Sequence, residues 1–313
     1  MDQILCSRCG FRKAIYLDRS SGHRMCGVCL YRDVESKIRE VISRYARDLR
    51  NSYAAYIDFF QPVPWNGLVI RILARILGRA GNRLIVLLYP WYSDCVDIFR
   101  SIAGDVDLII LGKTYVEEVL RICSDLGESI DFYACILKHQ MLLGLSLRSR
   151  GFNVEKIFIA RPREFSVDLA LKVLTGYNRE ILSEVYNDRT IEGLHIVNIL
   201  DRVSESSLIS LALRDRDLEN CYEKTFIEYV SQMPEKVRGV LFRENTVISM
   251  FKEIFYTSYE YMYTFPESMK RYYSLYSYRC RICSAPLSDS DQNLCRYCLR
   301  LTSALKDFSQ IFR

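Results

Sequence analysis

The residues best suited to chemistry in this sequence are cysteines, and eight of the twelve stand in Cys-x-x-Cys pairs, two pairs near each end. Sixteen residues separate the two pairs of the first set, and 11 residues separate those of the second. A two-residue gap lets both sulfurs of a pair face one ion, and four thiolates complete the tetrahedral shell that zinc prefers. The spacing therefore predicts two structural zinc ions, one held by Cys6, Cys9, Cys26 and Cys29 and the other by Cys280, Cys283, Cys295 and Cys298.

Two alternatives to this assignment stay open. Unligated or disulfide-bonded thiols would also account for the pairs, although disulfide frameworks are typical of short secreted chains rather than of 313 residues. His23, close to Cys26, either replaces one thiolate or is a surface residue, since four cysteines already complete the shell.

The overall composition predicts a folded, soluble protein. Half of the residues are hydrophobic, which is enough for one full-sized core with small accessory modules. No apolar run reaches the roughly 18 to 20 residues that cross a bilayer, and the sequence opens without a charged-then-apolar leader. We therefore expect a cytoplasmic protein without a membrane contact.

Positive charge gathers at both ends, although the net charge is only +5. Residues 1–50 hold 11 Lys and Arg against six acidic residues, and residues 267–313 hold eight against four. A polyanion such as RNA should therefore meet the ends first. The RNA-binding candidates lie on a basic amphipathic helix near 34–49 and beside a tyrosine-rich approach to the second cysteine set: Arg39, Arg44, Arg47, Lys270, Arg271 and Arg279. The alternatives are a solvated helix face and tyrosines that pack in a core.

Between the two ends, β-branched runs alternate with helical segments. Strands are predicted at 84–88, 108–111, 130–134, 156–160 and 195–200, and helices near 95–103, 115–126, 136–150, 166–175 and 205–213. This alternation predicts an α/β fold with a doubly wound, mainly parallel sheet. Because ligands of such folds lie beyond the carboxyl ends of the strands, we expect a site at the turns after residues 88, 134 and 160.

The predicted organisation has five parts. They are a zinc module with a basic helix at 1–50, a linker and short apolar helix at 51–82, the α/β domain at 83–216, a helical tyrosine-rich region at 217–278 and a zinc ribbon at 279–313. Pro62 and Pro64 mark the linker. The short helix is too short to span a membrane, so we expect a core or partner contact from it.

This order of parts resembles the archaeal and eukaryotic cytosolic tRNA 2-thiolation family, along nearly the whole sequence. The family belongs to the N-type ATP pyrophosphatases, so the resemblance implies an adenine nucleotide alpha hydrolase-like sheet flanked by N- and C-terminal zinc modules. It also implies an activity in which a tRNA uridine is adenylated and its oxygen is then replaced by sulfur from a ubiquitin-like carrier.

The sequence departs from this family at the active site. The family's first strand runs into a Ser-Gly-Gly-x-Asp-Ser loop whose amides cradle the ATP pyrophosphate. The corresponding stretch is identified here as Tyr89, Pro90, Trp91, Tyr92, Ser93 and Asp94. Pro90 has no N–H to donate, and two large rings stand where glycines let phosphate approach the backbone. After the fourth strand, residues 162–167 replace the family's Gly-His-Asn-x-Asp-Asp run, so both losses predict a pseudoenzyme.

The family's catalytic and iron–sulfur cysteines are only partly kept. Cys135 falls where the family's Cys-x-x-Cys begins, but the second position is Lys138, followed by His139. Cys221 falls near the family's last active-site cysteine. Two cysteines do not hold a [4Fe-4S] cluster in the family's three-cysteine manner, although the pair with His139 could bind some metal. The alternative is that both are small buried hydrophobes.

The leading functional hypothesis is a non-catalytic subunit of a tRNA 2-thiouridine synthesis complex. Its expected partners are tRNA and a catalytic paralogue or a second copy, in a hetero- or homodimer, with a ubiquitin-like sulfur carrier as a further candidate. Two structural zinc ions are expected, and neither ATP nor an iron–sulfur cluster is. The alternatives are an active ATP-dependent tRNA uridine 2-sulfurtransferase with a divergent loop, and a zinc-containing protein adaptor that does not bind RNA.

Overall fold

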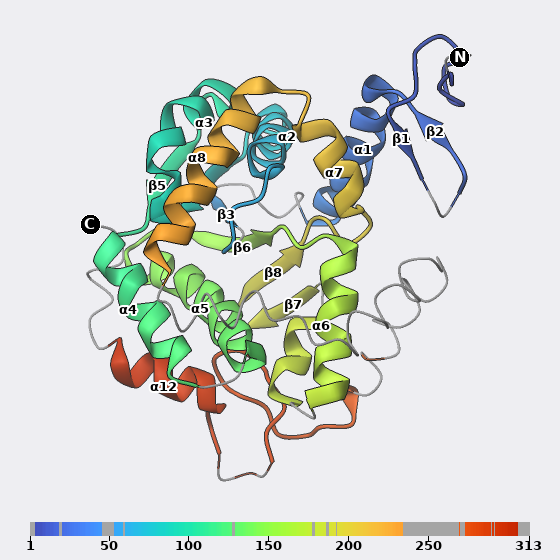
Figure 1. The fold of residues 1–313 in the computed structure, drawn as a ribbon. Helices are drawn as coiled ribbons and strands as arrows, with labels where there is room; N and C mark the ends of the chain where they lie inside the picture. Colours follow the sequence, from blue (N-terminus) through green and yellow to red (C-terminus); the bar gives the residue numbers. More distant parts are fainter. Residues whose placement is uncertain are drawn as a thin grey trace.

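A six-stranded sheet forms the centre of the protein, which we describe from a computed structural model (Figure 1). The structure describes residues 4–18, 21–45, 53–58, 60–126, 129–176, 179–185, 188–191, 193–233, 269, 273–288, 290 and 292–305. The sheet consists of β3 (Tyr53–Ile57), β4 (Arg83–Leu88), β5 (Asp107–Ile110), β6 (Val154–Ile159), β7 (Asp188–Ile191) and β8 (Leu194–Asn198).

The strand order is β5-β4-β3-β6-β8-β7, and all strands but one are parallel. Only β7 runs antiparallel, where it pairs with β8 at the edge. From β3 the chain moves outward to β5 and then returns to β6 on the other side of β3. The winding therefore reverses between β3 and β6, and the crevice at their carboxyl ends is the usual ligand position of such a fold.

Helices cover both faces of the sheet, so the strands read as near-continuous apolar runs (Figure 1). One face carries α2 (Asn66–Arg79), α3 (Val96–Ala103), α7 (Glu205–Ala212) and α8 (Arg216–Gln232). The other carries α4 (Lys113–Ser124), α5 (Ser129–Ser149) and α6 (Arg163–Gly176). Two 3-10 helices, η2 (Pro90–Cys95) and η3 (Arg179–Val185), follow β4 and α6. The predicted fold class, a doubly wound and mainly parallel α/β sheet, is confirmed.

A cysteine-rich module lies at each end of the described chain. The first consists of β1 (Tyr16–Leu17), β2 (Arg24–Met25) and the start of α1 (Gly27–Tyr45), which packs on α7. The second ends in α12 (Arg296–Ala304), which packs on α4 and α5 (Figure 1). None of the helices in the described residues is both long and apolar enough to cross a bilayer.

The linker predicted in the first part of the segment 51–82 is wrong, because that part contains the central strand β3. This strand pairs with β4 on one side and with β6 on the other. Pro62 and Pro64 belong to the turn that follows the strand rather than to a connection between domains. The predicted α/β unit at 83–216 therefore lacked its own first strand.

The predicted strand at 130–134 is also wrong, because these residues lie in the first turns of α5. A short apolar run fits a buried helix as well as a strand, and periodicity alone does not separate them. The strands predicted at 84–88, 108–111, 156–160 and 195–200 correspond to β4, β5, β6 and β8. Cys135 consequently lies within a helix and not at the end of a strand.

Candidate functional site

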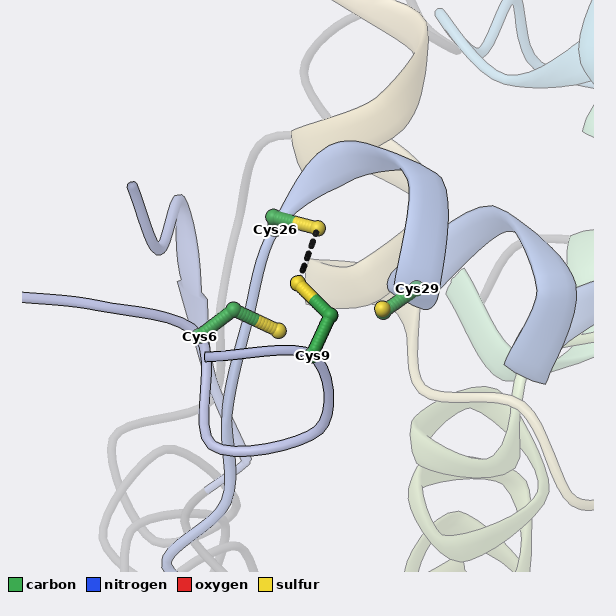
Figure 2. Close-up of side chains that lie close together, drawn as sticks. All are labelled: Cys6, Cys9, Cys26 and Cys29. Carbon is green, nitrogen blue, oxygen red and sulfur yellow. Dashed lines mark hydrogen bonds between the residues drawn. The ribbon is translucent and has the colours of Figure 1, made fainter. Parts of the chain in front are cut away.

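The four N-terminal cysteines form one cluster in which all four sulfurs lie within 4.8 Å of one another. Figure 2 shows the four side chains converging, with Cys6 and Cys9 on one turn and Cys26 and Cys29 at the start of α1. The sulfurs of Cys9 and Cys26 are 3.9 Å apart. A tetrahedral zinc ion with Zn–S bonds near 2.3 Å would hold its sulfurs about 3.8 Å apart. The donor set and its spacing therefore fit a zinc ion.

The local backbone explains how the first pair is held. The N–H of Gly10 donates to the carbonyl of Cys6 at 2.8 Å, which closes the turn around Cys9. Gly10 has a φ of 69°, a conformation that glycine adopts without steric strain. Cys26 directly precedes α1 and Cys29 lies in its first turn, so the positive end of the helix dipole faces the thiolates.

The C-terminal set repeats this construction and also has its four sulfurs within 4.8 Å of one another. The sulfurs of Cys283 and Cys295 are 3.5 Å apart. The N–H of Ser284 donates to the carbonyl of Cys280 at 2.8 Å. Ser284 has a φ of 58°, which is positive like that of Gly10 in the N-terminal set. Cys295 caps α12 by accepting from the N–H of Cys298.

The thiols of both sets are placed so that at least one of them is readily ionised. Burial opposes ionisation of Cys6, but backbone donors at Cys26, Cys9 and Arg8 lower its pKa to about 6. Hydrogen bonds from the neighbouring thiols, first of all from Cys283, hold the pKa of Cys280 well below its ordinary value. Since metals bind thiolates, both sets are prepared for a cation. His23 is exposed and is not part of the first set.

Cys135 and Cys221 have different partners. The sulfur of Cys221 lies within bonding distance of Cys95, and that of Cys135 lies within bonding distance of Cys123. All four side chains are buried. A metal site formed by Cys135, Cys221 and His139, one of the two alternatives left open, is therefore not assembled here, and both cysteines are buried as the other alternative expects. The Nε2 of His139 instead forms a hydrogen bond with the Tyr115 hydroxyl at 2.8 Å.

Aromatic side chains fill the carboxyl ends of β3 and β4. Tyr89 and Trp91 stack with their ring centroids 4.8 Å apart, and Phe60 packs edge-on against both at 5.4 Å. The ring of Tyr229 on α8 packs edge-on against Trp91, with the two ring centroids 5.1 Å apart. The aromatic cluster consists of Phe60, Tyr89, Trp91, Phe132 and Tyr229, all at most 5% exposed. Burial, with the nearby Asp58 carboxyl group, raises the pKa of Tyr89 well above its ordinary value.

A buried polar network continues from this cluster to the carboxyl end of β6. The side chain of Gln140 donates to the Asp58 carbonyl at 2.9 Å. Glu184 lies at the centre of the network, where Lys138 and Arg189 donate to it at 2.7 Å and Arg161 at 3.2 Å. Burial alone would raise the pKa of Glu184, but the three cations outweigh it and lower that pKa well below its ordinary value. The Glu184 carboxylate is therefore ionised and held by three cations, so it is not a free base.

The stretch predicted to replace the pyrophosphate loop, residues 89–94, was assigned to the wrong turn. It follows β4, the second strand, and forms η2. The turn after the first strand includes residues 58 and 60–65, and it holds Phe60, Pro62 and Trp65 rather than glycines. Of the residues in 89–94, Tyr89, Pro90, Trp91 and Tyr92 are buried, whereas Ser93 and Asp94 are exposed. Both turns thus contribute rings to the same edge of the sheet.

The RNA-binding candidates fall into three groups. Arg39 and Arg44 are exposed on α1, each in an ion pair one turn along the helix, with Glu35 and Glu40 respectively. Arg279 lies 3.7 Å over the ring of Tyr273, and the Tyr273 hydroxyl donates to the carbonyl of Ser284. Arg279 therefore supports the turn that holds Cys280 and Cys283. Arg47, Lys270 and Arg271 lie outside the described residues.

Sequence reasoning missed the ion cluster around Glu184 and the first strand beside it. Its members come from α5, the turn after β6, η3 and β7, so no spacing in the sequence relates them. The one signal was Lys138, a cation within an apolar run of α5, which is typical of a buried ion pair.

Comparison with solved structures relates this arrangement to a known fold. No protein-family model matches the chain, and no curated protein sequence matches it. A solved structure similar to it is the U34-tRNA thiolase NcsA from Methanococcus maripaludis with its [4Fe-4S] cluster, at a TM-score of 0.62 and 14% identity. The similarity covers 97% of this chain and 97% of the thiolase. The chain therefore shares the fold of that thiolase over nearly its whole length.

This comparison corrects one expectation about cofactors. An iron–sulfur cluster was not expected, yet the thiolase of the same fold has a [4Fe-4S] cluster. Sets of four cysteine thiolates ligate iron–sulfur clusters as well as zinc, and this chain has two such sets. The donor atoms alone consequently do not restrict the sites to zinc.

Proposed function

We propose that this protein is a non-catalytic subunit of a tRNA 2-thiouridine synthesis complex. In this role it binds tRNA and a catalytic paralogue, or completes the partner's site, without adenylating the uridine itself. The fold shared with a U34-tRNA thiolase supports the pathway. The position of the aromatic cluster supports the loss of catalysis.

The aromatic side chains at the carboxyl ends of β3 and β4 carry this proposal. Nucleotide-binding α/β folds place a glycine-rich turn there, so that backbone amides reach the phosphates. Here Phe60, Trp65 and Trp91 are buried at that edge, each at most 5% exposed. A triphosphate would have to displace these rings and would lose several charge-assisted hydrogen bonds of roughly 1.5 to 3 kcal/mol each. We therefore expect no productive ATP complex.

The test combines a nucleotide titration with a reconstitution assay. Calorimetry with ATP and Mg²⁺ should detect no binding by this chain, while a catalytic paralogue with an intact glycine loop serves as the positive control. The same paralogue should co-purify with this chain, and tRNA thiolation by the mixture should exceed that by the paralogue alone. Micromolar ATP binding by this chain would falsify the non-catalytic assignment, and failure to bind both tRNA and the paralogue would remove the subunit role.

A second candidate is an active tRNA sulfurtransferase, and the cluster of the similar thiolase favours it. If one four-cysteine set takes up a [4Fe-4S] cluster, anaerobic reconstitution with iron and sulfide should yield the cluster's electron paramagnetic resonance signal after reduction. A Cys9→Ser variant and a Cys298→Ser variant then identify which set holds it. Zinc retained at both sets with no such signal excludes this candidate.

A further inference from the structure

A groove between α1, α2 and the turn joining α7 to α8 is lined by arginines and has a volume of about 360 Å³. Arg32 comes from α1, Arg71 and Arg75 from α2, and Arg214 from the turn. Its floor is apolar, and Leu68 and Leu218 there are each 3% exposed. We call these four cations and this floor the arginine groove.

Two carboxylates hold part of the arginine groove in place. Glu35 accepts from Arg75 and also from Arg39, and Asp215 accepts from Arg71 at 2.7 Å. Four arginines and two acids line the groove, which leaves it positively charged. Arg32 and Arg214 are exposed and have no carboxylate partner within the described part of the chain. Their guanidinium groups are therefore available to an incoming anion.

The chemistry of the lining favours a nucleotide over an acidic peptide. All four cations are arginines, whose planar, weakly hydrated groups match phosphate in a bidentate manner. Arg75 lies 5.4 Å over the ring of Tyr31, and Tyr31 lines the groove beside the leucines of the floor, so aromatic and apolar surface adjoins the charges. A nucleobase has a flat face that fits such a surface, whereas an acidic side chain would leave the floor uncovered.

The arginine groove also adjoins the first cysteine module. Gly27 and Val28, which follow Cys26, form part of its wall. A Cβ on Gly27 would meet the Nε of Arg214 at 3.5 Å, so this side chain lies across the first turn of α1. The first cysteine module and the arginine groove are consequently adjacent on the surface of the protein.

We propose that the arginine groove binds a single-stranded segment of RNA, with phosphates on Arg32 and Arg214 and a base against the floor. This inference rests on the proposed role in tRNA modification and assigns the surface that such a role requires. Arg71 and Arg75 then act as cations preorganised by their carboxylates.

The test is a salt series of tRNA binding with the full-length protein and a fluorescent tRNA transcript. The Arg32→Gln/Arg214→Gln variant removes two charges that have no described ion pair, so its melting temperature should equal that of the unmodified protein. Its affinity near 0.1 M salt should fall by about tenfold or more, and the slope of log K against log salt should become shallower by about 1 to 2. The control, Arg100→Gln/Arg121→Gln, loses equal charge from α3 and α4 and should stay within about twofold.

Three outcomes would overturn the assignment. Equal affinity and equal slope in both double variants would show that tRNA does not bind at the arginine groove, although it binds elsewhere on the protein. Undetectable tRNA binding by the unmodified protein would remove the RNA part of the proposed function together with the groove. Binding of a labelled poly-glutamate peptide that depends on Arg32 and Arg214, with tRNA binding unchanged, would assign the groove to an acidic protein instead.

Discussion

Adjacent residues in α5 show how the environment of a side chain decides its charge. Lys138 and His139 are both fully buried. Burial opposes the charged form of Lys138, but the negative charges of the Cys283 thiolate and of Glu184 outweigh it and raise the pKa of Lys138. His139 has Tyr115 as its hydrogen-bond partner and no carboxylate among the described contacts, so burial lowers its pKa from 6.5 to about 3. The cation is thus held by an ion cluster, and the imidazole stays neutral.

We predict that His139 makes the protein sensitive to mild acid. Its folded-state pKa lies below its unfolded value, so between pH 6.5 and about 3 only the unfolded chain binds the proton. The free energy of unfolding should therefore decrease as the pH is lowered through this window, by up to about 1.4 kcal/mol per pH unit. Denaturant titrations at pH 7.5, 6 and 5 should show this loss relative to His139→Gln. Parallel pH profiles for the two proteins would contradict the prediction.

At the scale of elements, the same cysteine turn occurs twice with different residues at its key position. Gly10 and Ser284 each follow the second cysteine of a pair, and both have a positive φ. A side chain in this conformation costs roughly 1 to 2 kcal/mol, because Cβ approaches the following carbonyl. A Cβ on Gly10 would find no atom within 4 Å, so only the backbone opposes a substitution there.

We predict opposite effects from exchanging these residues. Gly10→Ala should destabilise the first module by about 1 kcal/mol, since alanine is strained at this φ. Ser284→Gly should stabilise the second module by a few tenths to about 1 kcal/mol, because relief of strain exceeds the added entropy of the unfolded chain. Competition with a chelator, which reports metal retention at each module, measures both. Changes of the same sign in the two variants would show that the turn conformation does not govern metal retention.

At the scale of the whole molecule, the two cysteine modules are attached in different ways. The C-terminal cysteines belong to the same hydrophobic core as the sheet, whereas Cys6, Cys26 and Cys29 form a separate cluster. The C-terminal module is also held by Asp131 of α5, which accepts from Arg296 at 2.5 Å and from the Tyr297 hydroxyl at 2.7 Å. Loss of metal at this end should therefore affect the α/β domain itself.

We predict that Cys298→Ser lowers the main thermal transition by roughly 5 °C or more, because the metal there supports a shared core. Cys9→Ser removes one ligand from the other set and should leave the main transition within about 2 °C. Differential scanning calorimetry of both variants, with metal content measured in parallel, provides the comparison. Equal shifts would mean that the two modules are coupled to the domain to the same extent.

The sequence by itself determined features that depend on short-range geometry. A two-residue gap between cysteines fixes which sulfurs can share an ion, and both predicted quartets gather in the structure. The β-branched runs of β4, β5, β6 and β8 identified the doubly wound sheet, because buried parallel strands need such residues on both faces. The prediction failed at β3, since nearby prolines suggested a linker, and at 130–134, where an apolar run served a buried helix.

Only the tertiary structure decided which residues meet. Phe60, Trp91 and Tyr229 come from three separate segments and pack together at the carboxyl ends of β3 and β4, although no sequence spacing relates them. The same holds for the ion cluster around Glu184 and for the arginine groove. The physical reason is that sheet order and helix packing, which arise from the whole core, bring these side chains together. Spacing along the chain determines which cysteines share a metal ion, whereas contacts between distant elements determine which residues line a pocket.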